Sequence, residues 1–238
     1  MRLRPDQLIS HLQRSGPAPV YCLSGDDPLQ LLEAEDAIRS HAREAGIQER
    51  SVLDVNKGFD WNVLARESAN LSLFSDRRLI ELRLGNHKPG KAGGEALTEY
   101  ATNINNDNVL LITAAKLDKA AQQTRWYKSL DSAGVTVQIW PIDNHRLPDW
   151  IVQRMQRLGK KMDRDAADLI AQRTEGNLLA AKQELEKLCL LIDKDRVSLQ
   201  DVMESVGDSA RYDVFALIEQ AYLGKPDRSR VRRRLPAS

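Results

Sequence analysis

Along the first 140 or so residues, short β-rich runs alternate with longer helix-like stretches, and this alternation leaves few folds open. The β-rich runs are Pro19–Leu23, Ser51–Val55, Arg78–Leu84, Val109–Thr113 and Val135–Trp140. Strands that alternate with helices are joined by crossovers and therefore run parallel. The run Val109–Ile112 is apolar at every position, which predicts a strand that is covered on both faces.

The stretches between these runs carry helix start and stop signals. In Pro28–Ala45, Asp27 is a candidate N-cap before Pro28, and Gly46 ends the helix. Asp60 is a candidate N-cap for a helix that contains Trp61 and Leu64 on one face. The other two stretches are Glu95–Ile104 and Ala120–Leu130. We therefore predict an α/β domain built on a five-stranded parallel sheet.

After Pro141 the β-rich runs stop and every periodic segment is helical. The predicted helices are Leu147–Leu158, Asp163–Thr174, Leu178–Ile192, Ser198–Val206 and a further amphipathic one at Val214–Leu223. The candidate N-caps are Asp163, Asn177 and Ser198, and the candidate stop residues are Gly159 and Gly176. This pattern predicts a small all-helical second domain that begins at about residue 143.

Composition and charge exclude several classes of protein. In 238 residues, 35 Lys and Arg balance 34 Asp and Glu, which argues against a polybasic nucleic-acid wrapper and an acidic tail. The two cysteines, Cys22 and Cys189, are far apart, which excludes a disulfide scaffold and leads us to expect a reducing cytoplasm. Cys22 lies in a predicted buried strand and Cys189 on a helix among leucines, so we expect both to be core thiols. The longest apolar run, Val109–Ala115, is too short to cross a bilayer, and we expect no signal peptide.

Basic residues gather in the last part of the chain. From Lys225 to Ser238 there are six basic residues and one acidic residue. Such a run can bind phosphate groups, and a nucleic-acid-binding module that uses this tail stays open as an alternative. No aromatic residue is interleaved to stack on bases, which favours a solvated chain end.

An α/β domain of this kind suggests a nucleotide-binding ATPase, which needs a phosphate loop after its first strand. The segment Ser24–Leu29 instead contains two aspartates and a proline, which would repel a phosphate and remove a backbone donor. A second segment, Gly85–Ala92, fits the pattern G-x-x-x-x-G-K. Its last position is Ala92 instead of a magnesium-binding Ser or Thr, and no acidic residue ends the run Val109–Thr113.

We therefore interpret Gly85–Ala92 as a basic surface loop, and keep a P-loop enzyme that uses Lys91 as an alternative. The four histidines are widely spaced and form no metal-binding pattern with the cysteines. The sequence predicts no catalytic residue, no metal and no cofactor. A nucleotide-binding architecture without the catalytic parts indicates a binding or mechanical role.

Several short motifs occur in an order that matches a known family. They are Gly25–Leu29, Trp61 ahead of Leu71–Ser75, Arg78, Val109–Ile112 with Lys116–Lys119, Trp126, and Glu175–Ala180 leading into Glu184–Leu188. Over roughly residues 1–225, the chain resembles the delta subunits of the bacterial DNA polymerase III clamp loader. The resemblance implies an AAA+/RecA-like α/β fold with three parts.

These parts are an ATPase-like domain over 1–142 without a functional phosphate loop, a helical lid domain over 143–208, and over 209–238 the start of a helical collar plus the basic tail. The segment from Arg228 to Ser238 departs from the family pattern. We therefore expect a truncated or frame-shifted chain, in which assembly through the collar is in doubt.

The resemblance also implies a function. Delta subunits bind the ring-shaped sliding clamp (the beta subunit) and open it for loading onto primed DNA during chromosomal replication. The implied partners are this clamp, the motor subunits gamma or tau, delta-prime and, through the assembled complex, primed DNA, with no membrane. The subunit is non-catalytic, although the DNA polymerase III holoenzyme to which it belongs is a nucleotidyltransferase.

By the same resemblance, the clamp contact maps to the hydrophobic pair Leu73 and Phe74, with Leu71, Ser72 and Ser75 beside it. Helical geometry agrees in part. If the helix that begins after Asp60 continues, Leu73 points away from the face that Trp61, Leu64 and Leu71 share. If the helix instead stops near Asn70, both hydrophobic residues can turn back into the domain.

Overall fold

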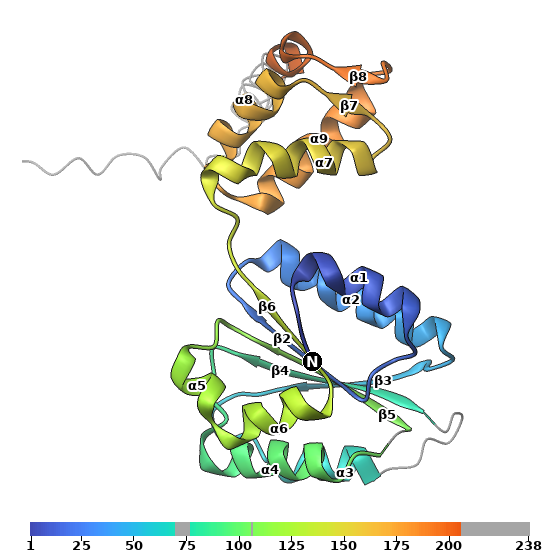
Figure 1. The fold of residues 1–238 in the computed structure, drawn as a ribbon, viewed down its shortest axis with the longest axis vertical. Helices are drawn as coiled ribbons and strands as arrows, with labels where there is room; N and C mark the ends of the chain where they lie inside the picture. Colours follow the sequence, from blue (N-terminus) through green and yellow to red (C-terminus); the bar gives the residue numbers. More distant parts are fainter. Residues whose placement is uncertain (70–76, 106, 206–238) are drawn as a thin grey trace, which may run out of the picture. The chain divides into compact units, whose positions relative to one another are not determined.

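The computed structural model describes residues 1–69, 77–105 and 107–205 (Figure 1). The chain divides into two compact units, one over Met1–Pro141 and a second that begins at Ile142. Each unit has its own set of buried apolar residues.

The first unit is built on a six-stranded sheet in the order β1-β6-β2-β5-β4-β3, and every neighbouring pair is parallel. The strands are β1 (Arg2–Leu3), β2 (Val20–Gly25), β3 (Glu49–Asp54), β4 (Arg78–Gly85), β5 (Asn108–Ala114) and β6 (Val135–Ile139). The five predicted strands are confirmed. The sixth, β1, pairs with Thr136 and Val137 of β6 and was not predicted, because two residues carry no recognisable period.

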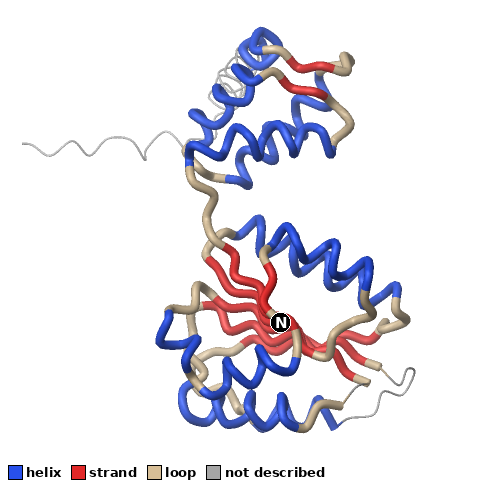
Figure 2. Tube along the Cα trace, in the orientation of Figure 1, coloured by secondary structure: helices blue, strands red, loops and turns tan. Residues whose placement is uncertain are grey.

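Helices cover both faces of this sheet (Figures 1 and 2). On one face lie α1 (Pro5–Arg14) and α2 (Pro28–Glu44), and on the other lie α3 (Asn62–Ala69), α4 (Gly90–Thr102), α5 (Lys119–Gln123) and α6 (Arg125–Ala133). Two apolar cores result, one on each side of the strands. Six of the seven residues of β5 are buried, as its continuous apolar sequence predicts.

The predicted helices differ from the observed ones mainly at glycines and at a threonine. Helix α4 begins at Gly90, five residues before the predicted start, because the Gly93-Gly94 pair obscured the helical pattern. The predicted helix Ala120–Leu130 is two helices that meet at Thr124. A Cβ at Gly93 would collide with the ring of Trp61, so this glycine lets α4 pack closely against the segment that leads into α3.

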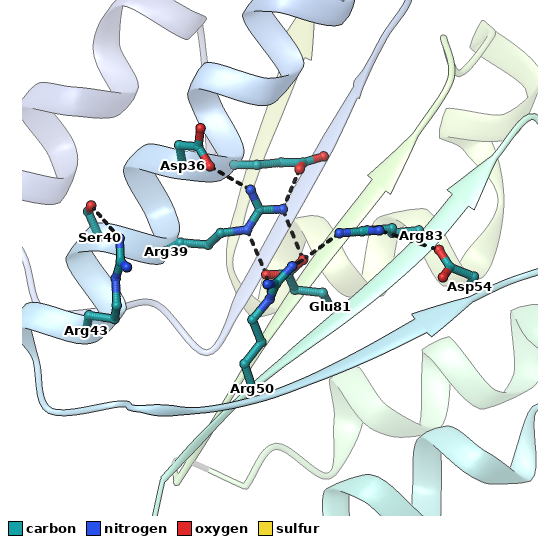
Figure 3. Close-up of polar contacts among 9 residues, drawn as sticks. Asp36, Arg39, Ser40, Arg43, Arg50, Asp54, Glu81 and Arg83 are labelled. Atoms are coloured by element: carbon teal, nitrogen blue, oxygen red, sulfur yellow. Dashed lines mark hydrogen bonds and ion pairs between the residues drawn. The ribbon is translucent and has the colours of Figure 1, made fainter.

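One buried ionic cluster ties α2 to the sheet (Figure 3). Glu81 of β4 is 2% exposed, and its carboxylate accepts hydrogen bonds from Arg39 of α2 (2.8 Å from Nε) and from Arg50 of β3 (2.6 Å from Nε). Arg83 lies 3.5 Å from the same carboxylate, and Glu35 and Asp36 bind the remaining side of Arg39. Burial acts to raise the pKa of Glu81, but the bonds from Arg39 and Arg50 lower it to about 2.

The second unit contains α7 (Leu147–Arg157), α8 (Arg164–Thr174), α9 (Leu178–Leu191), the short 3-10 helix η1 (Asn144–Arg146) and a helical segment over 199–205. The prediction of an all-helical unit needs one correction. A parallel pair, β7 (Lys161–Met162) with β8 (Arg196–Val197), joins segments that are far apart in sequence. The predicted collar start and basic tail, 209–238, lie outside the described residues.

The predicted caps of this unit behave differently from one another. The Asn177 side chain accepts a hydrogen bond from the Ala180 amide at 3.0 Å, as an N-cap does. Asp163 makes no such bond, because its carboxylate binds Arg196 at the start of β8. Ser198 donates its amide to the Asp201 carboxylate at 2.9 Å, which closes the first turn of the segment 199–205.

The Glu81 cluster predicts an acid-dependent contribution to stability. Because the folded-state pKa lies below the ordinary value of 4.5, this contribution is complete above pH 4.5 and is lost as the pH falls toward 2. We expect Glu81→Gln to lower the free energy of unfolding by about 3 kcal/mol at pH 7, with a smaller loss at pH 3.5. Urea denaturation at pH 7, 5 and 3.5 measures both.

The control is Asp36→Asn, which removes an exposed partner of Arg39 and should cost less than about 1 kcal/mol at every pH. A Glu81→Gln effect that is the same at all three pH values would contradict the assignment.

Candidate functional site

In a parallel α/β sheet the site for a nucleotide lies at the carboxyl ends of the strands, and here this edge is occupied by the protein's own contacts. The Asp26 side chain, directly after β2, accepts a hydrogen bond from the Lys116 amide at 3.0 Å. The Lys116 ammonium in turn lies 5.0 Å from the ring centroid of Trp140. A Cβ at Gly25 would collide with the Ile139 carbonyl at the end of β6. The loops after β2, β5 and β6 are therefore packed against one another.

The N-terminus of α2 is capped from within the chain. The Asp27 carboxylate accepts from the Gln30 amide at 2.8 Å, and the Asp27 carbonyl accepts from the Leu31 amide at 3.1 Å. Pro28 has no amide hydrogen to donate. A phosphate at this helix end would face two carboxylates and would have to displace the cap. The prediction that Asp27 and Pro28 are the N-cap and first helical residue is confirmed.

The second glycine-rich segment, Gly85–Ala92, connects β4 to α4. Gly85 and Gly90 both have positive φ angles, and the Gly85 carbonyl accepts from the Ala115 amide at 2.8 Å. Lys91 and Ala92 lie exposed in the first turn of α4. The segment thus follows β4 instead of β2, and a methyl group stands where a magnesium-binding hydroxyl would be needed.

At the opposite edge of the sheet, where strands begin, a polar brace holds the end of α3 beside the start of β4. Asn108 is 4% exposed and donates from its side-chain nitrogen to the Ser68 carbonyl at 3.0 Å. Arg78 donates to Glu67 of α3 at 3.1 Å and to Glu49 of β3 at 2.6 Å. We call these five residues the amino-edge brace.

The predicted clamp-contact residues follow α3 directly. Leu71, Ser72, Leu73, Phe74 and Ser75 all lie outside the described residues. The residues on either side are described. The α3 residue Leu64 is buried, and Trp61 packs against the same core, so the predicted apolar face of this helix is confirmed for these two residues.

The amino-edge brace was not predicted from the sequence. Arg78 is the first residue of the predicted strand Arg78–Leu84, but its two carboxylate partners come from segments 11 and 29 residues away. Asn108 precedes the apolar run Val109–Ile112, and a lone asparagine before a strand is an ordinary turn residue. The burial of Asn108 and its hydrogen bond to the Ser68 carbonyl become evident only in the folded structure, where α3 lies beside it.

The cysteines and the possible metal ligands form no reactive site among the described residues. Burial raises the pKa of the Cys22 thiol to about 12, as expected of a core cysteine. Cys189 lies 3.4 Å from the sulfur of Met155. Among residues 1–69, 77–105 and 107–205, no three His, Cys, Asp or Glu side chains come together as a metal site would require. The helices within those same ranges include none whose length and apolar content would let it span a membrane.

The strand order and the two helical layers give the first unit an AAA+-like fold. Two solved structures share this fold. The clamp loader delta protein of Bacillus subtilis matches with a TM-score of 0.65 at 22% identity, over 91% of this chain and 66% of that one. A RuvB variant of Thermotoga maritima matches with a TM-score of 0.50 at 16% identity, over 84% of this chain and 65% of that one.

The sequence comparisons identify the family. The family described as "DNA polymerase III, delta subunit" matches residues 21–139. DNA polymerase III subunit delta of Escherichia coli K12 is 31% identical over 229 residues, and that of Haemophilus influenzae is 30% identical over 234 residues. Both alignments cover 96% of this chain but only 66% and 67% of the relatives. The chain therefore belongs to the DNA polymerase III delta subunit family and spans about two thirds of the length of these relatives.

The capped carboxyl edge predicts that nucleotide does not stabilise the protein. A ligand present at 100 times its dissociation constant would add about 2.7 kcal/mol to the free energy of unfolding. We expect no shift of the melting temperature with 2 mM ATP and magnesium, measured by differential scanning fluorimetry. A shift that disappears in Lys91→Ala would contradict this prediction and support a phosphate loop at Gly85–Ala92.

Proposed function

We propose that this chain carries the clamp-binding part of a clamp-loader delta subunit, which binds the sliding clamp and opens its ring without catalysing a reaction. The observation that carries the proposal is its membership of the delta family, together with the amino-edge brace on either side of the segment 70–76. Leu73 and Phe74 are the proposed contact residues, with Leu71, Ser72 and Ser75 beside them.

The brace supports this proposal because a protein contact needs a well-positioned segment. Hydrogen bonds tie the described residues on either side of the segment 70–76 to the sheet: Glu67 and Ser68 before it, and Arg78 after it. A segment that lies between two fixed attachment points loses less conformational entropy when it binds a partner. The brace is therefore expected to increase affinity without touching the partner.

The position of the brace also separates clamp binding from nucleotide chemistry. It lies where β4 and β5 begin, whereas Asp26, Asp27 and the capped end of α2 lie where β2 ends. In a strand of seven residues these edges are about 20 Å apart. The clamp contact then has no need of a nucleotide in this chain, and ATP use belongs to the motor subunits.

Ring opening requires only differential affinity. If the segment binds an open or strained clamp more tightly than a closed one, binding itself shifts the ring toward opening. Burying Leu73 and Phe74 in a clamp pocket can contribute roughly 2–3 kcal/mol each. We further propose that the motor subunits gamma or tau, delta-prime and primed DNA are partners of the assembled complex, and that the protein works in the cytoplasm.

The first test removes the proposed contact. We expect Leu73→Ala with Phe74→Ala to weaken binding to a bacterial sliding clamp more than about 1,000-fold, because some 4–6 kcal/mol of apolar burial is lost. Isothermal titration calorimetry without nucleotide measures the affinity, and circular dichroism checks the fold.

The matched control is Ile9→Ala with Leu32→Ala, which removes two exposed apolar side chains from α1 and α2. Clamp affinity should be unchanged in this control. A folded Leu73→Ala, Phe74→Ala protein that binds the clamp as tightly as the parent would overturn the contact assignment.

The second test weakens the brace. Asn108→Ala leaves the Ser68 carbonyl without its partner and should lower clamp affinity several-fold, because the end of α3 is less well held. The control is Thr136→Ala, which removes a buried side-chain hydrogen bond to Asp131 elsewhere in the unit. If both variants are equally destabilised and only Asn108→Ala loses clamp affinity, the brace has a positioning role. Equal clamp affinity in the two variants would contradict that role.

A further inference from the structure

The strand β3 is the outermost strand on one side of the six-stranded sheet, and among the described residues no strand pairs with its outer side. It is six residues long and contains neither proline nor glycine, whereas the outermost strand on the other side, β1, has two residues. Proteins usually shorten or cover such a strand, because its unpaired backbone groups can pair with another chain. The outer side of β3 is therefore the place where this sheet can be extended.

The backbone of β3 faces β4 and the outside in alternation. The Val55 amide, directly after the strand, donates to the Arg83 carbonyl of β4 at 2.9 Å. Since backbone groups point to alternate sides along a strand, those of residues 49, 51 and 53 also face β4. The amides and carbonyls of Arg50, Val52 and Asp54 therefore face outward. Within residues 1–69, 77–105 and 107–205 they make no backbone hydrogen bond outside the pair with β4.

The side chains of these three residues share one face of the strand, and all three are exposed. Val52 is 39% exposed, and the side chains of Arg50 and Asp54 are 44% and 71% exposed. Arg50 binds Glu81 through Nε and Nη2, which leaves its Nη1 group to bind a further carboxylate. Asp54 lies 3.8 Å from Arg83, beyond hydrogen-bond distance. An apolar β-branched residue thus lies between a cation and an anion that can each take another partner.

A second copy of the same strand fits this outer side when the two strands run antiparallel. If Val52 faces Val52 of the second copy, Arg50 of each chain lies directly opposite Asp54 of the other. Each of these pairs can exchange two N–H···O bonds, so every outward backbone group of the strand is used. A register centred on Ser51 would instead set Arg50 opposite Val52 and Asp54 opposite Gln48, which precedes the strand. The register with the longest ladder is therefore also the one that pairs the charges.

We propose that two copies of this chain associate through β3, which pairs antiparallel with β3 of the second copy about a two-fold axis at Val52. Cross-strand pairs of β-branched and of oppositely charged side chains stabilise this contact. The self-complementary order of Arg50, Val52 and Asp54 favours a second copy over an unrelated strand, because one two-fold axis pairs both charges at once. One added strand buries little surface, so the dissociation constant is on the order of 100 µM. The contact is independent of the proposed clamp contact.

The first experiment measures self-association of the full chain. Sedimentation equilibrium between 10 µM and 1 mM should show a monomer–dimer equilibrium. Asp54→Lys should weaken the dimer about tenfold, because each cross-strand ion pair becomes a contact between two cations. The matched control, Glu99→Lys, makes the same change of charge at an exposed position of α4 and should leave the association unchanged. A parent protein that is monomeric at 1 mM, or equal association of the two variants, would overturn the proposal.

The second experiment locates the contact. Hydrogen exchange measured by NMR should slow several-fold at the amides of Arg50, Val52 and Asp54 between 10 µM and 1 mM, because only the dimer protects them. Val52→Pro removes the central outward donor but no hydrogen bond to β4, so it should stay folded by circular dichroism and monomeric at 1 mM. Concentration-dependent protection in other elements but not in β3 would contradict the assignment, as would a folded Val52→Pro protein that dimerises like the parent.

The clamp proposal is kept apart by the same variants. Asp54 ends β3, whereas the amino-edge brace lies where β3 and β4 begin. Asp54→Lys should therefore bind the sliding clamp as the parent does while its self-association falls.

Discussion

The sheet of the first unit is apolar on both faces, and the rest of that unit depends on covering it. Buried residues of β2, β4 and β5 belong alternately to the core beneath α1 and α2 and to the core beneath α3, α4 and α6. Parallel strands of this kind are stable only between two helical layers. Gly93 lets α4 approach the ring of Trp61 closely, and Trp61 packs against the core on this face. These contacts position α3 and so help the helices to cover the sheet.

The two edges of this sheet, one where the strands end and one where they begin, have different roles. At the carboxyl edge, Asp26 accepts a hydrogen bond from the Lys116 amide and Asp27 caps α2 through the Gln30 amide. The position at which a nucleotide-binding sheet of this kind holds phosphate is therefore occupied by the chain itself. At the amino edge, Asn108 and Arg78 hold the end of α3 beside the start of β4. The proposed clamp contact depends on the second edge.

Glu81 shows how the same sheet accommodates charge. A carboxylate that is almost fully buried is costly unless it is paired, and here arginines from α2 and β3 both bind it. The cluster joins α2, β3 and β4 across more than 40 residues of sequence (Figure 3). The cluster therefore helps to hold α2 against the sheet and also stabilises the folded state.

The sequence alone determined the five long strands, most helices and the N-cap at Asp27, because periodicity and capping are local properties. The order of short motifs also identified the family. Local patterns did not predict five features, and these became evident only in the tertiary structure. They are the pairing of β1 with β6, the pairing of β7 with β8, the early start of α4, the Glu81 cluster and the amino-edge brace. In the strand pairings, the Glu81 cluster and the brace, groups from distant segments satisfy one another's hydrogen bonds or charges, and the start of α4 depends on Gly93, which packs against Trp61. Such partners are known only once the chain has folded.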